Sequence, residues 1–222
     1  MSFVDTIGLT RKITRPRLEA FLSRFATDKK TLDIGCGNDV YGHLFPNRVR
    51  LDIEKRLGVE VDIIGDAHDL HQIQDGSFDI ILCSEVLEHL HTPQKALDEF
   101  MRVLKPGGLL LLTTRFIFPL HDVPGDYFRF TKYGLKHLLR DFEIEELQEE
   151  TNTIETLSVL CQRIGFQCQT LWLRPFKLLW FLAAKVLLLF PRILTKEYGD
   201  ISHKRKEEKI LSSGYYVAAR KR

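Results

Sequence analysis

The chain has 222 residues, of which 44% are apolar and 28% charged, and this is an ordinary globular composition long enough for one sizeable core. A formal net charge of +2 gives no global indication of nucleic-acid binding. The four cysteines form no Cys-x-x-Cys pair, which argues against a zinc site or a secreted disulfide framework and favours a reducing cytoplasm. The N-terminus lacks a basic region followed by an apolar one, so no secretory signal is expected.

Apolar periodicity predicts a helix over residues 15–27, followed by strands that alternate with helices or loops. Strands are expected at 31–34, 48–53, 59–64, 78–83 and 108–114, with a sixth at 142–147 and a seventh at 214–220. A helix is predicted over 93–104, where Thr92 can cap it and Pro93 lies in its first turn, and another begins near Thr131. Continuous apolar runs such as residues 80–83 indicate strands covered on both faces, as in a parallel sheet.

The ends of these strands carry acidic residues and glycines in a regular order. The first strand contains Asp33 and runs into Gly35-Cys36-Gly37, a turn whose backbone can approach a ligand closely. The second strand carries Asp52, 17 residues after Gly35. Gly65-Asp66-Ala67 closes the third strand and Ser84-Glu85 closes the fourth. Each signal is common by itself, and their order makes the set specific.

Taken together, these segments resemble the class I S-adenosylmethionine-dependent methyltransferases, most closely over residues 28–142. The nearest likeness is to the type 11 branch, whose fourth strand reads like Ser84-Glu85-Val86-Leu87-Glu88-His89-Leu90. The resemblance implies a doubly wound α/β fold of Rossmann-like methyltransferase type. Its seven-stranded sheet would be mostly parallel, with an antiparallel last strand. It also implies S-adenosylmethionine as cofactor and S-adenosylhomocysteine as product.

The resemblance further implies a role for each strand end in holding this cofactor. Asp33 and Gly35 would lie near the methionine moiety, with Cys36 and Gly37 in the turn. Asp52 would accept hydrogen bonds from both ribose hydroxyls, since a carboxylate offers two acceptor oxygens. The remaining cofactor-binding residues are expected to flank the adenine (Ile53), to bind its amino group (Asp66, with Ala67 nearby) and to close the pocket (Ser84, Glu85).

Two other interpretations of these residues are open. Many relatives have a third glycine where this chain has Asp39, and the same residues can serve as an ordinary turn with strand-end caps. A nicotinamide-binding site would need Gly-x-Gly-x-x-Gly, but Val40 stands at the sixth place. That interpretation also leaves Gly65-Asp66-Ala67 without a role.

The loop over residues 121–131 is the predicted acceptor side, because methyltransferases of this branch have a similar loop. His121 is the first candidate for general base and Asp126 the second, with Tyr127 and His89 as further candidates. The alternative is that Asp126 pairs with Arg129 and that Tyr127 packs locally. No metal is predicted: the histidines at 68, 71, 89 and 91 have no metal-ligand spacing on one helix and are expected at the surface.

A long segment separates the last two strands. We interpret residues 151–212 as a helical, partly apolar insertion within a single domain over 1–222, with a helix near 154–164 that Gly165 ends. Residues 171–191 are strongly apolar, but Arg174, Lys177 and Lys185 disfavour a membrane span. The segment could lie on a membrane surface, pack in the core or form a homodimer. The nine Lys/Arg against four Asp/Glu after residue 191 favour anionic lipid.

The sequence therefore predicts an enzyme that methylates a small-molecule, glycan or lipid-linked acceptor, preferentially on oxygen. We expect it in the cytoplasm, at the inner face of the membrane if the apolar segment docks there. Two rival interpretations remain. One is a catalytically inactive binding protein that keeps the methyltransferase fold. The other is a nucleic-acid methyltransferase, although Ser84-Glu85-Val86-Leu87 replaces the Asn/Asp-Pro-Pro-aromatic motif of that group.

Overall fold

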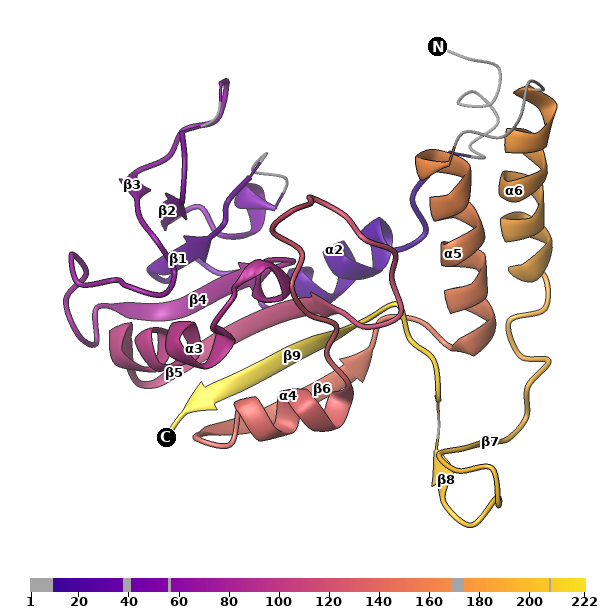
Figure 1. Ribbon diagram of the computed structural model, residues 1–222. Coiled ribbons are helices and arrows are strands. Elements are labelled where there is room, and N and C mark those ends of the chain that lie inside the picture. Colours follow the sequence, from indigo (N-terminus) through magenta and orange to yellow (C-terminus); the bar gives the residue numbers. More distant parts are fainter. Residues whose placement is uncertain (1–9, 38–40, 56, 169–173, 208) are drawn as a thin grey trace. The chain divides into compact units, whose positions relative to one another are not determined.

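The computed structural model describes residues 10–37, 41–55, 57–168, 174–207 and 209–222 (Figure 1). Asp39 and Val40, which bear on the path of the glycine loop, lie outside the described residues. The chain forms two compact units. The larger comprises Glu19–Phe116, Leu120–Gln148 and Tyr215–Arg222, and the smaller comprises Met1–Leu18, Ile117–Pro119 and Glu149–Gly214. The smaller unit contains the segment predicted as an insertion, and its status within a single domain stays a prediction.

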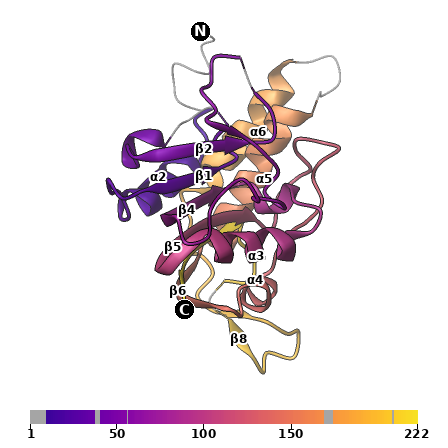
Figure 2. The same ribbon diagram turned by 90° about the vertical axis from the view of Figure 1, so that its left-hand side faces the viewer.

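A seven-stranded sheet with the order β3-β2-β1-β4-β5-β9-β6 forms the centre of the larger unit (Figure 1). Parallel pairing joins β1 to both neighbours, with Ile34 opposite Leu51 on one side and Cys83 on the other. Figure 2 shows β2, β1, β4 and β5 following one another across the sheet. The arrow of β9 runs opposite to that of β6 in Figure 1, so the predicted antiparallel last strand is confirmed together with the α/β fold class. The strands are β1 (Thr31–Ile34), β2 (Arg48–Asp52), β3 (Ile63–Ile64), β4 (Phe78–Ser84), β5 (Leu104–Arg115), β6 (Phe142–Glu149) and β9 (Gly214–Lys221).

Two strands differ markedly in length from the prediction, whereas the other five agree with it within two residues. Strand β3 has only two residues, because its pairing with β2 is confined to Leu51 opposite Ile63 and Asp52 opposite Ile64. Strand β5 begins at Leu104, directly after a helix, because Leu104 pairs with Phe78 before the register shifts towards Ile80. The sequence pattern missed this early start because Pro106-Gly107-Gly108 reads as a turn.

The helices of this unit agree with the apolar periodicity. Helix α3 (Pro93–Val103) begins with the predicted proline and buries Leu97 and Phe100. Thr92 does not cap it through its side chain, contrary to expectation; its Oγ1 lies 2.8 Å from Nδ1 of His91. Helix α4 (Lys132–Leu138) is capped by Thr131, whose Oγ1 accepts a hydrogen bond from the amide of Gly134. Helix α2 (Arg15–Ser23) is shorter than predicted, and the short 3₁₀ helices are η1 (Gly42–Leu44) and η2 (Leu87–His89).

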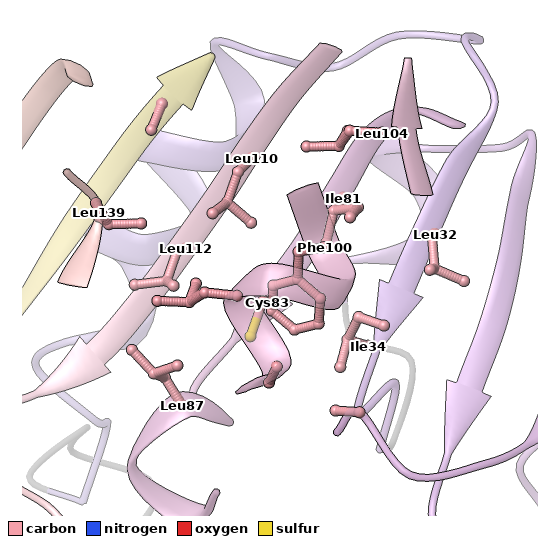
Figure 3. Close-up of a cluster of buried hydrophobic side chains, with 14 of the residues drawn as sticks. Leu32, Ile34, Ile81, Cys83, Leu87, Phe100, Leu104, Leu110, Leu112 and Leu139 are labelled. Atoms are coloured by element: carbon pink, nitrogen blue, oxygen red, sulfur yellow. The ribbon is translucent and has the colours of Figure 1, made fainter. Parts of the chain in front are cut away.

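The core lies between the central strands and the helices that cover them. Figure 3 shows the side chains of Leu32, Ile81 and Leu110, which come from β1, β4 and β5, together with Phe100 of α3. Cys36 and Cys83 are buried cysteines in the reduced thiol form. Burial raises the pKa of the Cys83 thiol, and the nearby carboxylate of Glu88 raises it further. The core thus holds the strands in place through their buried side chains. The carboxyl ends of the strands remain available to form a binding site.

The smaller unit contains a helix pair and a short hairpin. Helix α5 (Thr153–Gln167) begins with a capping box, in which Asn152 Oδ1 accepts from the Glu155 amide at 2.9 Å and Glu155 Oε2 accepts from the Asn152 amide at 2.9 Å. Helix α6 (Arg174–Leu187) packs on α5, and Ser158 Oγ donates to the carbonyl of Ala184. Strands β7 (Glu197–Tyr198) and β8 (Lys206–Glu207) pair antiparallel.

Gly165 does not end α5 as predicted. The helix continues for two more residues, and a Cβ at this position would lie 3.0 Å from Cζ of Phe181 on α6. Gly165 therefore permits the close approach of an aromatic ring. Within the described part of the chain, no helix is both long and apolar enough to cross a membrane.

Candidate functional site

A pocket of about 610 Å³ opens at the carboxyl ends of β1, β2 and β4. Open α/β sheets bind ligands at this edge because the strand order reverses there and leaves a crevice. Of the fourteen residues predicted for the site, eight line the pocket. They are Gly35, Asp52, Ile53, Asp66, Ala67, Glu85, His89 and Tyr127.

The glycine turn after β1 is fixed by contacts with its neighbours. Gly35 has φ of +66° and Gly37 has φ of +50°, a backbone conformation that side chains disfavour. Position 35 also requires glycine for a steric reason, because a Cβ there would lie only 2.5 Å from Cγ2 of Val86. The amide of Gly37 donates to Oδ2 of the buried Asp52 at 3.2 Å. The turn and the carboxylate that ends β2 therefore form one unit.

The next wall carries Asp66, Ala67 and His68. Oδ1 of Asp66 accepts from the His68 amide at 2.9 Å and lies 2.6 Å from His68 Nδ1. Nε2 of His68 accepts from the Thr92 amide at 3.3 Å, so the neutral ring carries its proton on Nδ1 and donates it to Asp66. Burial opposes ionisation of Asp66, but these hydrogen bonds from His68 outweigh it and hold the pKa of Asp66 below its usual range.

His68 was expected at the surface, and this prediction was wrong. The residue is 5% exposed, and its ring stacks on His91 with centroids 4.2 Å apart. His91 itself is exposed and lines the pocket, as does His68. No sequence pattern indicates this burial, because His68 lies in an irregular segment without apolar periodicity.

Glu85 occupies a strained backbone position beside the glycine turn. Its φ is +59°, and its amide donates to the Thr113 carbonyl at 3.0 Å. Its carboxylate accepts from Thr113 Oγ1 at 3.0 Å and pairs with Arg115. These contacts fix the carboxylate at the floor of the pocket, so Glu85 contributes a preorganised negative charge.

Six of the predicted residues lie outside the lining. The carboxylate of Asp33 lies 3.9 Å from Nε of Arg48, and Ser84 Oγ lies 3.2 Å from Thr113 Oγ1. The others are Cys36 and Gly37 in the turn, and His121 and Asp126 behind the opposite wall. Their predicted roles in binding or catalysis stay predictions.

That opposite wall consists of η2 and the loop after β5. Nδ1 of His89 lies 2.9 Å from the carbonyl of Gly125; a carbonyl only accepts, so Nδ1 carries the proton. The rings of His89 and His121 meet edge to face with centroids 4.8 Å apart. The amide of Tyr127 donates to the carbonyl of Glu88 at 3.0 Å, and its side chain is 54% exposed on the pocket wall.

Asp126 makes the pairing with Arg129 that the sequence left open. Its Oδ1 and Oδ2 each accept from the guanidinium at 2.6 Å, and Oδ2 also accepts from the His121 amide at 2.9 Å. The Arg129 guanidinium lowers the pKa of Asp126 to about 2. A carboxylate held this firmly in its ionised form is a weak base, which argues against Asp126 as the general base; the catalytic role of His121 stays a prediction.

Glu88 was quoted in the strand motif but not predicted as a functional residue. Its side chain is fully buried, and Oε2 accepts from Thr114 Oγ1 at 2.7 Å. Burial alone would raise the pKa of Glu88, but His121, Thr114 and the charge of Arg115 together lower it. Its Oε1 lies 3.8 Å from Nε2 of His121. The contact between the buried Glu88 and His121 cannot be seen in the sequence, because it forms only when β5 brings residues 88, 114 and 121 together.

Comparisons with known proteins relate part of the chain to methyltransferases. The family described as methyltransferase domain matches residues 32–112. Human thiol S-methyltransferase TMT1B is 29% identical over 96 residues, covering 36% of this chain and 39% of that protein. A ubiquinone biosynthesis O-methyltransferase from Xanthomonas oryzae pv. oryzae is 33% identical over 101 residues, covering 38% and 42%. A tRNA (carboxymethyluridine(34)-5-O)-methyltransferase from Arabidopsis thaliana is 35% identical over 116 residues, covering 47% and 28%.

The chain thus spans about two fifths or less of these relatives. Among solved structures, a SAM-dependent methyltransferase from Archaeoglobus fulgidus has a TM-score of 0.56 at 17% identity, covering 95% of this chain and 94% of that one. The [4+2]-cyclase SpnF has a TM-score of 0.55 at 20% identity, covering 94% and 80%. At this level of identity the likeness concerns the fold alone.

Strand order, glycine turn and strand-end carboxylates agree with the matched segment. Residues 32–112 thus match the methyltransferase domain family, and the sheet has the fold of a SAM-dependent methyltransferase.

Proposed function

We propose that this protein transfers a methyl group from S-adenosylmethionine to a small-molecule acceptor, with an oxygen as the favoured acceptor atom. The observation that carries the proposal is the pocket in which Gly35, Asp52, Asp66 and Ala67 meet at one sheet edge in the order that this class uses. The donor set fits the cofactor. Asp52 offers a buried carboxylate for ribose hydroxyls, and Ile53 offers an apolar side chain that is 69% exposed on the pocket wall.

The bound cofactor supplies a methyl group activated by a sulfonium, and the sulfur keeps the electron pair of the broken C–S bond. The residues of the chain position the acceptor and exclude water. His121 accepts the proton of an acceptor hydroxyl. Asp126 is a positioning residue, because its Oδ2 holds the backbone amide of His121 and lies 3.5 Å from its Nδ1.

Two observations support a hydroxyl as the acceptor group. His89 and Tyr127 on the acceptor wall can hydrogen-bond a hydroxyl. Two of the three reported relatives are by name O-methyltransferases and one is an S-methyltransferase. We therefore place a hydroxyl acceptor first and a thiol second, and keep glycans and lipid-linked hydroxyls within the proposed class.

The cofactor part is tested by calorimetric titration with S-adenosylhomocysteine. Asp52→Ala should abolish micromolar binding. Asp79→Asn is the matched control, because Asp79 lies at the opposite end of the sheet on β4 and pairs with Lys105 Nζ at 2.8 Å. Equal affinities for wild type and Asp52→Ala would contradict the assigned site.

The transfer itself is tested with S-adenosylmethionine labelled in the methyl group and parallel panels of hydroxyl, thiol and amine acceptors. Cofactor binding without turnover on any panel would favour a non-catalytic binding protein. The structural likeness to a cyclase supports keeping this alternative, because proteins with one fold can have different activities. Salt-dependent affinity for RNA would favour the nucleic-acid alternative, to which the tRNA methyltransferase relative points.

A second proposal concerns helix α6: its outer face rests on an anionic membrane surface. Phe181 and Ala184 are buried on the inner side, whereas Leu179, Leu182 and Val186 are 42–56% exposed on the other. Leu189 and Phe190 continue the exposed side beyond the helix. The excess of basic residues after position 191 matches anionic headgroups.

Vesicle flotation with phosphatidylserine-containing and purely zwitterionic liposomes tests this second proposal. The triple variant Leu179→Gln, Val186→Gln, Leu189→Gln should lose binding to the anionic vesicles. Ile201→Gln is the control, because Ile201 is fully exposed outside this face. If the wild type does not float, and sedimentation shows a dimer that the triple variant lacks, a second copy covers the face instead.

A further inference from the structure

Glu88, His89 and His121 bring together the ligand atoms of a metal site. One carboxylate oxygen and one nitrogen from each imidazole all lie within 4.8 Å of one another. Glu88 and His89 come from η2 after β4, and His121 comes from the loop after β5. The adjacent ends of two parallel strands therefore converge on this point. His89 lines the pocket, so the cluster borders its acceptor end.

The strongest indication is Oε1 of Glu88. This oxygen is buried and has no hydrogen-bond partner among the described residues, while its twin Oε2 is satisfied by Thr114. Leaving a buried carboxylate oxygen unpaired is costly, because the oxygen loses its hydration and gains no partner in return. A cation at Oε1 would supply the missing partner.

The spacing fits coordination better than hydrogen bonding. Oε1 of Glu88 and Nε2 of His121 are 3.8 Å apart, which is too long for a hydrogen bond. Two ligands of a first-row cation, each about 2.0–2.2 Å from it, lie roughly 3–3.5 Å apart in tetrahedral or octahedral geometry. A shift of a few tenths of an ångström would bring the two atoms to that distance.

Both imidazoles are oriented by their other nitrogen. Nδ1 of His89 donates to the Gly125 carbonyl, which leaves the lone pair of the neutral ring on Nε2. Nδ1 of His121 lies 3.5 Å from both Asp126 Oδ2 and a guanidinium nitrogen of Arg129, and its Nε2 faces Glu88. Histidines that bind metals in proteins almost always have such a carbonyl or carboxylate partner on the second nitrogen, which fixes the tautomer.

We propose that Glu88, His89 and His121 bind a divalent first-row transition-metal cation at the acceptor end of the pocket. Two imidazoles and one carboxylate suit Zn²⁺, Mn²⁺, Co²⁺ or Fe²⁺, whereas Mg²⁺ and Ca²⁺ prefer oxygen ligands alone. Three protein ligands leave coordination positions open for an acceptor oxygen. The site itself stands independently of the proposed methyl transfer; its role in activating a hydroxyl rests on that function. With the ion bound, His121 is a ligand and no longer the proton acceptor.

The test uses the full chain, treated with chelator and then titrated with Zn²⁺ by calorimetry and with Co²⁺ by visible absorption. Wild type should bind one ion, and Glu88→Gln and His89→Gln should each weaken binding at least tenfold. His71→Asn is the matched control: His71 also has a carboxylate beside its Nδ1, Asp69 at 3.1 Å, but both are exposed and outside the cluster. Its affinity should equal that of wild type.

Binding of S-adenosylhomocysteine to each variant separates this inference from the proposed function and shows that the variant is folded. Cofactor binding without Zn²⁺ binding by the wild type would overturn the metal site and leave the methyltransferase proposal standing. Zn²⁺ binding without cofactor binding would support the metal site and contradict the methyltransferase proposal. Unchanged Zn²⁺ affinity in both Glu88→Gln and His89→Gln, or its loss in His71→Asn, would place the ion elsewhere and overturn the inference.

Discussion

The two ends of the pocket are built in different ways. The cofactor end consists of backbone turns and strand-end carboxylates that follow one another along the chain, such as Gly35, Asp52 and Asp66. The acceptor end is assembled from side chains on separate loops, and its key contacts join Glu88 to Thr114 and His121. The first is set by local geometry that recurs across the class. The second depends on which loops this chain carries, so we expect acceptor specificity to depend on this end.

The largest effect is expected at the cofactor end from Gly35→Ala. The new Cβ would meet Val86 at 2.5 Å in a backbone with positive φ, so the turn must move. We expect S-adenosylhomocysteine affinity to fall more than tenfold in calorimetry. Gly58→Ala is the control, since Gly58 has a positive φ of +79° but an open surrounding. If Gly35→Ala binds as tightly as Gly58→Ala, the turn tolerates a side chain at position 35 and contact with Val86 does not control cofactor affinity.

At the acceptor end, Thr114→Val should act on stability and turnover but not on the cofactor. It removes the hydrogen bond to Oε2 of Glu88 and leaves a fully buried carboxylate unsatisfied. We expect a loss of about 1–3 kcal/mol in the free energy of unfolding, measured by urea denaturation. S-adenosylhomocysteine affinity should stay within twofold. A marked loss of cofactor affinity would show that the two ends are coupled.

The pH dependence of stability tests the Asp126–Arg129 pair. The pKa of Asp126 is lowered from 3.8 to about 2 in the folded protein, so its stabilisation is complete above pH 4 and disappears as the pH falls through 2. The difference amounts to about 2 kcal/mol. The stability difference between wild type and Asp126→Asn should therefore shrink between pH 4 and pH 2. A constant difference over that range would exclude titration of this carboxylate as the cause.

The smallest effect is expected from Ile53→Ala on the cofactor wall. Removing part of an apolar side chain that would flank the adenine should cost about 1 kcal/mol, or roughly fivefold in S-adenosylhomocysteine affinity. Ile64→Ala is the matched control, because Ile64 is 59% exposed at the end of β3 but does not line the pocket. Equal affinity for the two variants would remove Ile53 from the adenine site.

The fold class and most of the residues at the cofactor end could be predicted from the sequence alone. Strand periodicity and the glycine turn are local, and parallel strands must bring their carboxyl ends to one edge, so Asp52 and Asp66 could be assigned to one pocket. Helix α3 was predictable for the same reason, because its proline start and apolar face are encoded within a few residues. The short β3 and the early start of β5 were missed, since strand ends depend on pairing.

The arrangement of side chains at the acceptor end depends on tertiary contacts. His68 is buried because its ring lies between Asp66 and the Thr92 amide, which no periodicity reports. Glu88 and His121 are 33 residues apart in sequence, and they meet because β4 and β5 are neighbours in the sheet. Hydrogen bonding and charge between distant residues depend on distances that folding sets. The pattern along the chain therefore indicates where a ligand binds, whereas the packing of the loops determines which groups face it.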